Sequence, residues 1–288
     1  LSISPEIITD STAQLLLDKK YIYNSSYLQI VTPSLWLKKL VEKSILRNHP
    51  AELIYNGVNT NIFQPYNSKP LRQKLGISPD GIIIGSVATG SILRNQWKGG
   101  EYTLDALEKL QSSGLDFTFI NIGSSEPSNN PHIMNIPQII DEIDLAYIYS
   151  LLDIFLYTPK ADNCPLVVLE AQACGLPIVT FSVGGIPELV RDGMDGIITQ
   201  FGDTDGLVRG ILQLANNPEL RSQYSANARQ HAIESFDHEN IITPAYEALY
   251  RKTIENAANT KRQAKLLPAT SVPSVVLSHP FIQGEISK

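Results

Sequence analysis

Short runs of apolar residues alternate with longer segments of helical periodicity from about residue 80 onward. The apolar runs lie at 82–87, 117–122, 154–157, 178–181 and 196–199. Continuous apolar runs of this length are typical of strands that are buried on both faces. Segments with helical periodicity occupy 99–112, 145–152, 166–174, 186–190, 205–215, 218–234 and 239–256. The alternation predicts an α/β fold, a doubly wound parallel sheet of the Rossmann-like type.

The first 80 residues and the last 30 are less regular. The elements expected near the start are one or two helices within 1–30, a strand at 28–32, a helix at 35–46 and a strand at 53–55. Ser34 is expected to cap the helix at 35–46, and Asn56-Gly57 is a strong turn signal after the strand at 53–55. Residues 258–288 show no periodicity, so a poorly ordered tail is predicted there.

In a doubly wound sheet, ligands bind at the carboxyl ends of the strands. The segment at 158–179, T-P-K-A-D-N-C-P-L-V-V-L-E-A-Q-A-C-G-L-P-I-V, runs from one such strand end through a helix. Asp162 precedes this helix and Glu170 lies on it, so carboxylates and unpaired helix N–H groups can meet a phosphate or sugar hydroxyls. The alternative is structural: Asp162 and Asn163 cap the helix, and Glu170 is a solvated helix residue.

Composition narrows the range of partners. The chain has 288 residues and a formal net charge of −6 without a Lys/Arg run, so a nucleic acid is not an expected partner. No apolar stretch reaches about 18 residues, so no transmembrane segment is expected. The first residues do not form a signal peptide and read as the interior of a longer chain. A cytoplasmic location is expected, with attachment to the inner face of the membrane as an option.

The residue types that commonly bind metals occur here in settings typical of packing and helix capping. Cys164 and Cys174 lie in or beside an apolar helix, where small buried packing residues are expected rather than a disulfide or a zinc site. Asp203 and Asp205 form an Asp-x-Asp sequence just before a predicted helix, where capping and the helix dipole account for acidic residues. The five histidines have no metal-ligand spacing, and no metal is expected.

Five motifs resemble those of the retaining glycosyltransferases with the GT-B fold, the glycosyl transferases group 1 (family 4). The strongest is D-N-C-P-L-V-V-L-E at 162–170, which is similar to the Glu-x7-Glu motif of that family. The others stand in the same order as in the family: T-P-S at 32–34, N-G-V-N-T-N-I-F-Q-P at 56–65, K-G-G at 98–100 and V-G-G-I-P-E-L-V-R-D-G at 183–193. The resemblance covers about residues 28–255 and concerns mainly the C-terminal donor-binding domain.

The resemblance implies roles for the two carboxylates. Glu170 would bind the ribose hydroxyls of the nucleotide. Asp162 stands where the family has its first Glu, which contacts hydroxyls of the donor sugar, and its side chain is one methylene shorter. These two residues are therefore the expected catalytic pair.

The resemblance also implies further contacts to the donor. The sugar and phosphate would be held by the backbone of Asn163, Cys164, Pro165 and Leu166. Lys98 and Arg94 would meet the diphosphate, where fixed cations stabilise the charge that develops on the leaving group; solvated loop residues are the alternative. Gly85 resembles the glycine at the end of the first strand that lets the backbone approach the nucleotide, and a tight turn is its alternative. Gly184-Gly185 is expected either to pass the donor or to serve as a structural turn.

The expected function is transfer of a sugar, with retention, from a nucleotide sugar such as a UDP- or GDP-sugar to a hydroxyl of a saccharide or lipid-linked acceptor. No cofactor is expected besides this co-substrate. The expected parts are a remnant of an N-terminal acceptor domain at 1–29, the donor domain at 30–235, helices at 236–257 that pack back toward the first domain, and the tail.

With so little acceptor domain, the chain is expected to bind donor but to transfer poorly alone. The alternatives are a non-catalytic nucleotide-sugar binding fragment and a sugar-nucleotide epimerase of similar fold.

Overall fold

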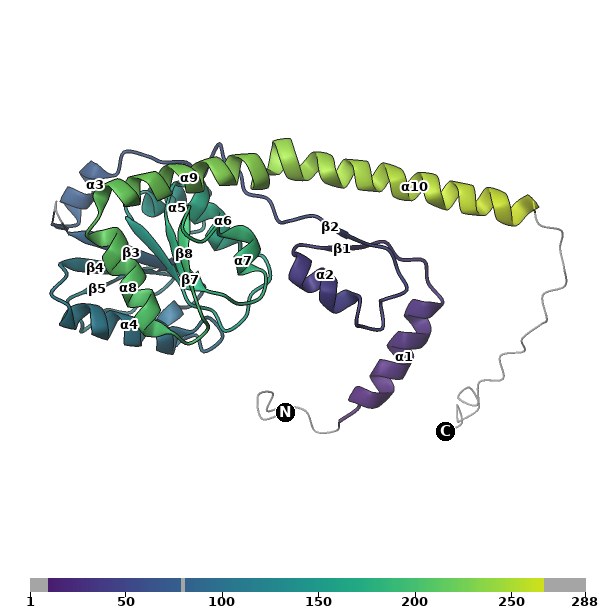
Figure 1. The fold of residues 1–288 in the computed structure, drawn as a ribbon, viewed down its shortest axis with the longest axis horizontal. Coiled ribbons are helices and arrows are strands. Elements are labelled where there is room, and N and C mark those ends of the chain that lie inside the picture. The colour runs from purple at the N-terminus through teal and green to yellow at the C-terminus, as the bar shows by residue number, and fades with distance from the viewer. Residues whose placement is uncertain (1–9, 79–80, 267–288) are drawn as a thin grey trace, which may run out of the picture. The chain divides into compact units, whose positions relative to one another are not determined.

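The computed structural model describes residues 10–78 and 81–266, with side chains described through residue 259 (Figure 1). The chain divides into two compact units between Tyr246 and Glu247. The first unit contains the sheet and all the residues that the sequence analysis singled out. The boundary falls within the last helix, α10 (Thr243–Leu266).

A six-stranded parallel sheet forms the centre of the first unit. In spatial order its strands are β5 (Ile133–Ile136), β4 (Phe117–Ile122), β3 (Ile82–Val87), β6 (Ile154–Tyr157), β7 (Ile178–Phe181) and β8 (Gly196–Thr199). Every neighbouring pair is parallel. The chain passes from β3 to β4 on one side and later enters β6 on the other, so the strand order reverses between β3 and β6. This reversal is the switch point near which doubly wound sheets bind ligands. The predicted fold class is confirmed.

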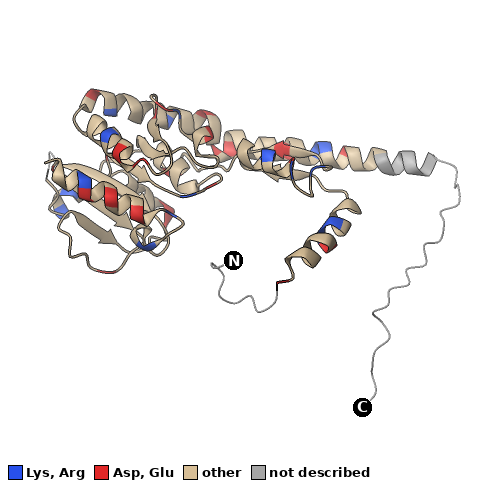
Figure 2. Ribbon diagram, turned by 60° about the horizontal axis from the view of Figure 1, so that its bottom comes forward, with Lys and Arg blue, Asp and Glu red and all other residues tan. Residues whose placement is uncertain are grey.

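Helices cover both faces of the sheet because alternate strand residues point to opposite faces. Ile82 and Ile84 belong to a cluster with α4 (Gly100–Ser112) and α8 (Thr204–Ala215). Ile83 belongs to the other cluster, whose helical residues come mainly from α5 (Glu142–Tyr149), α6 (Leu166–Ala173), α7 (Ile186–Leu189) and α9 (Pro218–Phe236). Positions occupied by Lys, Arg, Asp and Glu are interspersed along these helices (Figure 2).

The segment before the sheet forms a small substructure of its own. β1 (Ile30–Thr32) and β2 (Ala51–Leu53) pair in parallel as a separate two-stranded sheet, with α2 (Leu35–Val41) between them in the chain. Ser34 caps α2 as predicted, because its hydroxyl oxygen accepts a hydrogen bond from the Leu37 N–H at 3.0 Å. The helix ends at Val41, earlier than the expected residue 46. The segment also includes α1 (Thr12–Asn24) and α3 (Lys69–Lys74).

Two features near the ends of elements differ from the expectation. β5 was not predicted, and it forms the edge of the large sheet beside β4. After α9 the chain makes a π-helical turn, η2 (His238–Ile242), and continues as α10 to Leu266. Residues 258–266 are therefore helical rather than part of a poorly ordered tail; the rest of the predicted tail, 267–288, lies outside the described residues. The assignment of 1–29 and 236–257 to a first domain stays a prediction.

Candidate functional site

Two charged side chains meet across the switch point. Lys98 lies in the loop between β3 and α4, and Asp162 lies in the loop between β6 and α6. The Lys98 ammonium donates to Asp162 Oδ2 at 2.7 Å and to the Tyr157 hydroxyl oxygen at 3.0 Å. The Tyr157 hydroxyl in turn donates to Asp162 Oδ2 at 2.5 Å. The structure thus brings two predicted site residues together and adds a third, the fully buried last residue of β6.

The charges in this group are mutually stabilised. Burial alone would raise the pKa of Asp162, but hydrogen bonds from Lys98 and Tyr157 outweigh it and hold that pKa below its usual range. Burial, followed by the charge of Asp162, raises the pKa of Tyr157, so the phenol stays protonated and keeps donating. An ammonium group has three protons, and these two contacts use two of them. Lys98 is 36% exposed, so it retains a donor for an anionic ligand.

Side chains distant in the sequence hold the loop that carries Asp162. The Asn56 side chain donates to the Cys164 carbonyl at 2.8 Å, and the Ser34 hydroxyl forms a short hydrogen bond to the Asn163 side chain. The resemblance placed Ser34 and Asn56 within motifs but indicated no role for either side chain. Both fix the loop between β6 and α6 from the substructure that precedes the sheet.

Glu188 attaches the same substructure to α7. Its two carboxylate oxygens accept hydrogen bonds from the Leu35 N–H at 2.6 Å and the Trp36 N–H at 2.7 Å. The Tyr55 hydroxyl donates to it at 3.2 Å. Burial, then the charge of Glu188, raises the pKa of Tyr55 to about 12. The carboxylate therefore satisfies the first N–H groups of α2 and joins the segment just after β2 to α7.

The Gly184-Gly185 turn touches the loop directly through its backbone. The Gly185 N–H donates to the Asp162 carbonyl at 3.0 Å. Gly184 has φ +57°, and a Cβ there would lie 1.8 Å from the Asp162 carbonyl oxygen. A Cβ on Gly185 would lie 2.0 Å from the Asn163 carbonyl oxygen. Glycine is required at both positions by this close approach, which supports the structural reading of the turn.

The start of α6 presents backbone donors next to Asp162. Pro165 is the N-cap residue of the helix. The N–H groups of Cys164, Leu166 and Val167 have no hydrogen-bond partner within 10–78 and 81–266. Burial raises the pKa of the Cys164 thiol to about 11, so it stays neutral beside Asp162. Both cysteines are buried and free, as expected for packing residues.

Glu170 lies in the middle of α6 and is half-buried. Its carboxylate accepts a hydrogen bond from the Tyr149 hydroxyl at 2.8 Å. Burial, together with the charge of Glu142, raises the pKa of Glu170, although the hydrogen bond from Tyr149 opposes the shift. Glu170 is thus not the solvated helix residue of the structural alternative. Tyr149, the last residue of α5, is fully buried and was not indicated by the sequence.

Two expected donor contacts have other partners. Arg94, in the short 3-10 helix η1 (Ile92–Arg94), forms a bidentate salt bridge with Glu126 in the loop after β4. Both side chains are largely exposed. Gly85 lies within β3, which continues to Val87 as predicted. A Cβ on Gly85 would lie 2.4 Å from the Leu152 side chain, so packing accounts for this glycine.

The Asp-x-Asp sequence serves the helix that follows it. Asp203 caps α8 by accepting a hydrogen bond from the Gly206 N–H at 2.8 Å. Asp205 forms a salt bridge with Lys109 of α4 at 2.7 Å. The capping interpretation of Asp203 is confirmed. In the part of the chain that the structure describes, no helix combines the length and the apolar character needed to span a membrane.

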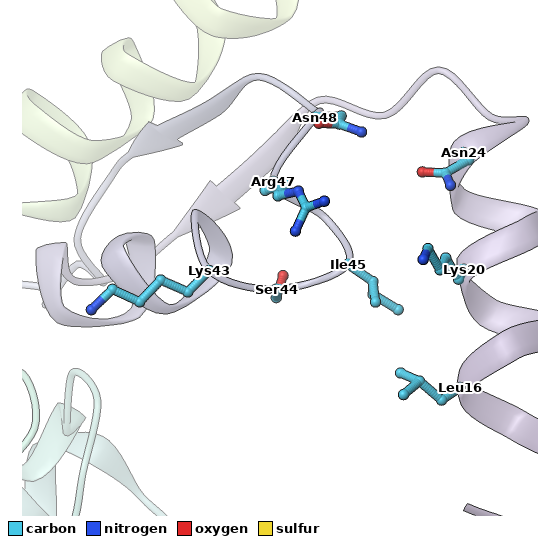
Figure 3. Close-up of a pocket in the computed structure, with 8 residues that line it drawn as sticks. All are labelled: Leu16, Lys20, Asn24, Lys43, Ser44, Ile45, Arg47 and Asn48. Carbon is cyan, nitrogen blue, oxygen red and sulfur yellow. The ribbon is translucent and has the colours of Figure 1, made fainter. Parts of the chain in front are cut away.

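A hollow of about 440 Å³ lies away from the switch point, between α1 and residues 43–48 (Figure 3). Leu16 and Lys20 face Ile45 across it. None of its eight lining residues is buried. It is an open surface hollow, and the candidate site rests instead on the side chains that converge at the ends of β3 and β6.

The fold and these side chains together define a Rossmann-like domain with a polar site at its switch point. Residues 85–217 match the family model of the glycosyl transferases group 1. This part of the chain is therefore similar to a glycosyl transferases group 1 domain, and the six-stranded sheet has the Rossmann-like fold of GT-B glycosyltransferases.

Curated relatives are glycosyltransferases. Over 227 residues, the chain is 24% identical to N-acetyl-alpha-D-glucosaminyl L-malate synthase of Bacillus anthracis, covering 74% of the chain and 57% of that relative. Over 252 residues it is 29% identical to D-inositol 3-phosphate glycosyltransferase of Mycobacterium leprae, covering 80% of the chain and 56% of that relative. The chain spans about half the length of the curated relatives it matches.

Solved structures share the fold at low sequence identity. Sucrose-phosphate synthase from Thermosynechococcus elongatus superposes with a TM-score of 0.71 at 20% identity, over 88% of this chain and 64% of that one. Anabaena Alr3699/HepE, solved in complex with UDP and glucose, has a TM-score of 0.68 at 21% identity, over 83% of this chain and 67% of that one.

Proposed function

We propose that this chain binds the nucleotide-sugar donor of a retaining glycosyltransferase, and that residues 30–235 are its donor-binding part. The observation that carries the proposal is the meeting of Lys98 and Asp162 at 2.7 Å from the two loops that flank the switch point. The cation of this pair comes from the loop before α4 and the carboxylate from the loop before α6. Their position at the ends of β3 and β6 is where ligands bind in sheets of this kind.

Each group has a role that follows from its chemistry. The Lys98 ammonium and the unpaired N–H groups at the start of α6 stabilise the negative charge that develops on the departing nucleoside diphosphate. Asp162 accepts hydrogen bonds from hydroxyls of the transferred sugar, and Glu170 accepts them from the vicinal ribose hydroxyls. Neither Gly85 nor Arg94 is part of the proposed site, since Gly85 packs against Leu152 and Arg94 pairs with Glu126.

Reaction chemistry beyond donor binding is proposed from the family. The sugar passes from the donor to an acceptor hydroxyl, with retained anomeric configuration and no metal. The acceptor is a saccharide or a lipid-linked saccharide, and the donor is a UDP- or GDP-sugar. HepE, in complex with UDP and UDP-glucose, makes uridine donors the first to test.

Isothermal titration calorimetry tests donor binding. Wild type is titrated with UDP-glucose and GDP-mannose, and the nucleotide sugar that binds is then titrated into Glu170→Ala. Loss of hydrogen bonds to a charged group should weaken binding by about tenfold or more. Glu108→Ala, which removes an exposed glutamate from α4, is the matched control and should bind like wild type.

Two results would overturn the assignment: no nucleotide sugar binds wild type, or Glu170→Ala binds as tightly as Glu108→Ala. Release of the nucleoside diphosphate in the presence of a saccharide acceptor separates an enzyme from a binding fragment. An epimerase would instead convert the donor into a second nucleotide sugar without any acceptor.

A further inference from the structure

Each of the two site carboxylates rests on the hydroxyl of a buried tyrosine. The Tyr157 hydroxyl donates to Asp162 Oδ2 at 2.5 Å, and the Tyr149 hydroxyl donates to Glu170 Oε2 at 2.8 Å. Both tyrosines are 0% exposed, so water cannot replace either contact. A phenol has a single proton to donate. For Tyr157 the acceptor is Asp162, and for Tyr149 the nearer acceptor is Glu170, since the Val167 carbonyl lies at 3.4 Å.

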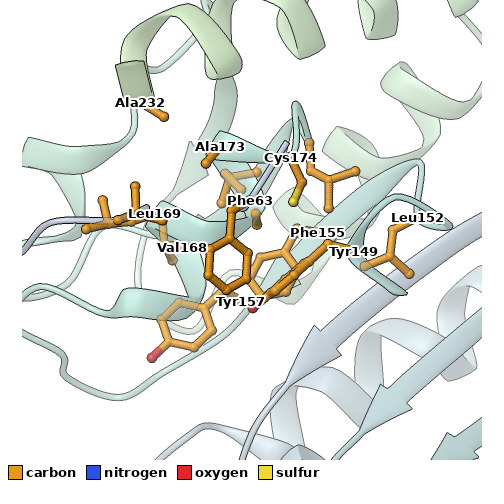
Figure 4. Packing of buried hydrophobic residues seen from close by; sticks show 14 of the residues in the cluster. Phe63, Tyr149, Leu152, Phe155, Tyr157, Val168, Leu169, Ala173, Cys174 and Ala232 are labelled. Carbon is orange, nitrogen blue, oxygen red and sulfur yellow. The ribbon is translucent and has the colours of Figure 1, made fainter. Parts of the chain in front are cut away.

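The rings that carry these hydroxyls form a continuous aromatic row in the core (Figure 4). The centroids of Tyr149 and Phe155 are 5.8 Å apart, and those of Phe155 and Tyr157 are 6.3 Å apart. Phe63 packs edge-on against Tyr149 at 6.1 Å. Close packing in a core restricts ring motion, so the two hydroxyl groups have fixed positions relative to each other and to the sheet.

The two carboxylates differ in what else they contact. Asp162 also accepts hydrogen bonds from the Lys98 ammonium and the Asn163 N–H. Glu170 Oε1 has no hydrogen-bond partner among the residues for which side chains are described. A carboxylate accepts about four hydrogen bonds, so each retains capacity for a ligand while the tyrosine fixes its orientation.

We propose that Tyr157 and Tyr149 are positioning residues with separate duties. Tyr157 sets the carboxylate that recognises the transferred sugar, and Tyr149 sets the carboxylate that recognises the nucleotide. The inference rests on the proposed function, since it assigns the sugar to Asp162 and the ribose to Glu170. It adds that the aromatic row of the core, rather than the loop or α6 alone, determines how well each half of the donor is held.

The test compares one nucleoside diphosphate with its sugar derivative, UDP with UDP-glucose or GDP with GDP-mannose, according to which pair binds wild type. Calorimetry gives both dissociation constants for wild type, Tyr157→Phe and Tyr149→Phe. Each substitution removes one hydroxyl and keeps the ring. Tyr224→Phe is the matched control, because Tyr224 is a buried tyrosine of α9 that packs in the other core cluster. Thermal unfolding of all variants reports the stability of the fold.

The two variants are expected to differ in how the two dissociation constants change. Tyr157→Phe should weaken the sugar nucleotide about tenfold more than the nucleoside diphosphate, so the ratio of the two constants changes. The ratio is the readout because Lys98 also contacts Tyr157, and a loss at Lys98 weakens both ligands. Tyr149→Phe should weaken both ligands by a similar factor, about tenfold, and leave the ratio unchanged.

A general loss of stability would weaken both ligands alike in both variants. It would therefore not change the ratio of the dissociation constants in Tyr157→Phe alone. An unchanged ratio in Tyr157→Phe, or constants in Tyr149→Phe that match those of Tyr224→Phe, would overturn the inference. Failure of wild type to bind any of the four ligands would instead overturn the proposed function itself.

Discussion

The close approach of Gly184 to the Asp162 carbonyl oxygen predicts that a Cβ at residue 184 would displace this carbonyl. In Gly184→Ala the new Cβ would lie 1.8 Å from that oxygen, so the carbonyl must move by about 1 Å or more to reach an ordinary separation. The shift breaks the 3.0 Å hydrogen bond from the Gly185 N–H. It also moves the backbone that carries the Asp162 side chain.

The expected loss of stability combines three terms. A left-handed backbone, φ +57° here, costs an alanine about 1–2 kcal/mol. Overpacking costs about 1–3 kcal/mol, and a lost hydrogen bond costs about 0.5–1.5 kcal/mol. Gly184→Ala should therefore destabilise the fold by about 2.5–6.5 kcal/mol, which lowers the Tm by roughly 10–15 °C for a domain of this size.

Gly76→Ala is the matched control for the backbone term. Gly76 also has a positive φ, +67°, but a Cβ there meets nothing within 4 Å. Its expected cost is the backbone term alone, about 1–2 kcal/mol, or about 4 °C in Tm. Thermal unfolding followed by circular dichroism measures both variants, and calorimetry measures their affinity for the donor.

The comparison of Gly184→Ala with Gly76→Ala, in Tm and in donor affinity, tests whether the close approach of the turn matters. Gly184→Ala should lose stability and donor affinity, whereas Gly76→Ala should lose only a little stability. Equal melting temperatures with equal donor affinities would refute the claim that the close approach of this turn positions Asp162.

Two further predictions concern stability away from the site. Asp195 is fully buried and accepts hydrogen bonds from the Arg191 side chain at 2.5 Å and from its N–H at 2.7 Å, beside His231. Burial raises its pKa, but His231 and Arg191 outweigh this and hold the pKa below 3.8, so its contribution is present above pH 4 and lost as pH falls further. The Tm difference between wild type and Asp195→Asn should thus shrink from pH 7 to pH 3, and a constant difference would contradict it. Asp203→Ala removes the cap of α8 and should cost about 1 kcal/mol in urea unfolding, whereas Asp203→Asn, which can still cap, should cost less.

The central strands could be predicted because burial on both faces leaves a plain mark in the sequence. β3, β4, β6, β7 and β8 coincide with the apolar runs. β5 did not, because every residue of this edge strand is half-buried and Asn135 interrupts its apolar run. The start of α5 was placed three residues late, since Asp141 caps the helix ahead of its apolar residues.

The loops that form the site and the charged residues on them could be predicted from the sequence. Asp162 and Lys98 follow strands that flank the switch point, so their meeting is a consequence of the strand order. Tyr149 and Tyr157 could not be identified in this way, because each fits an apolar pattern. Nothing in the spacing indicates which group accepts the hydrogen bond from the hydroxyl of either residue. The packing role of Gly85 could not be predicted, because a glycine within an apolar run gives no sign of the Leu152 side chain that fills its space.

The attachment of the β1–α2–β2 substructure has a consequence for dividing the chain. A shortened protein beginning just before α3 would keep all six strands and the side chains of Lys98, Asp162 and Glu170. It would lose Ser34 and Asn56, which hold the loop after β6, and would leave the Glu188 carboxylate without its N–H partners. The same cut would also remove Phe63, which packs against Tyr149 in the core, so the segment before α3 contributes both to the packing of the domain and to the restraint of the loop that carries Asp162.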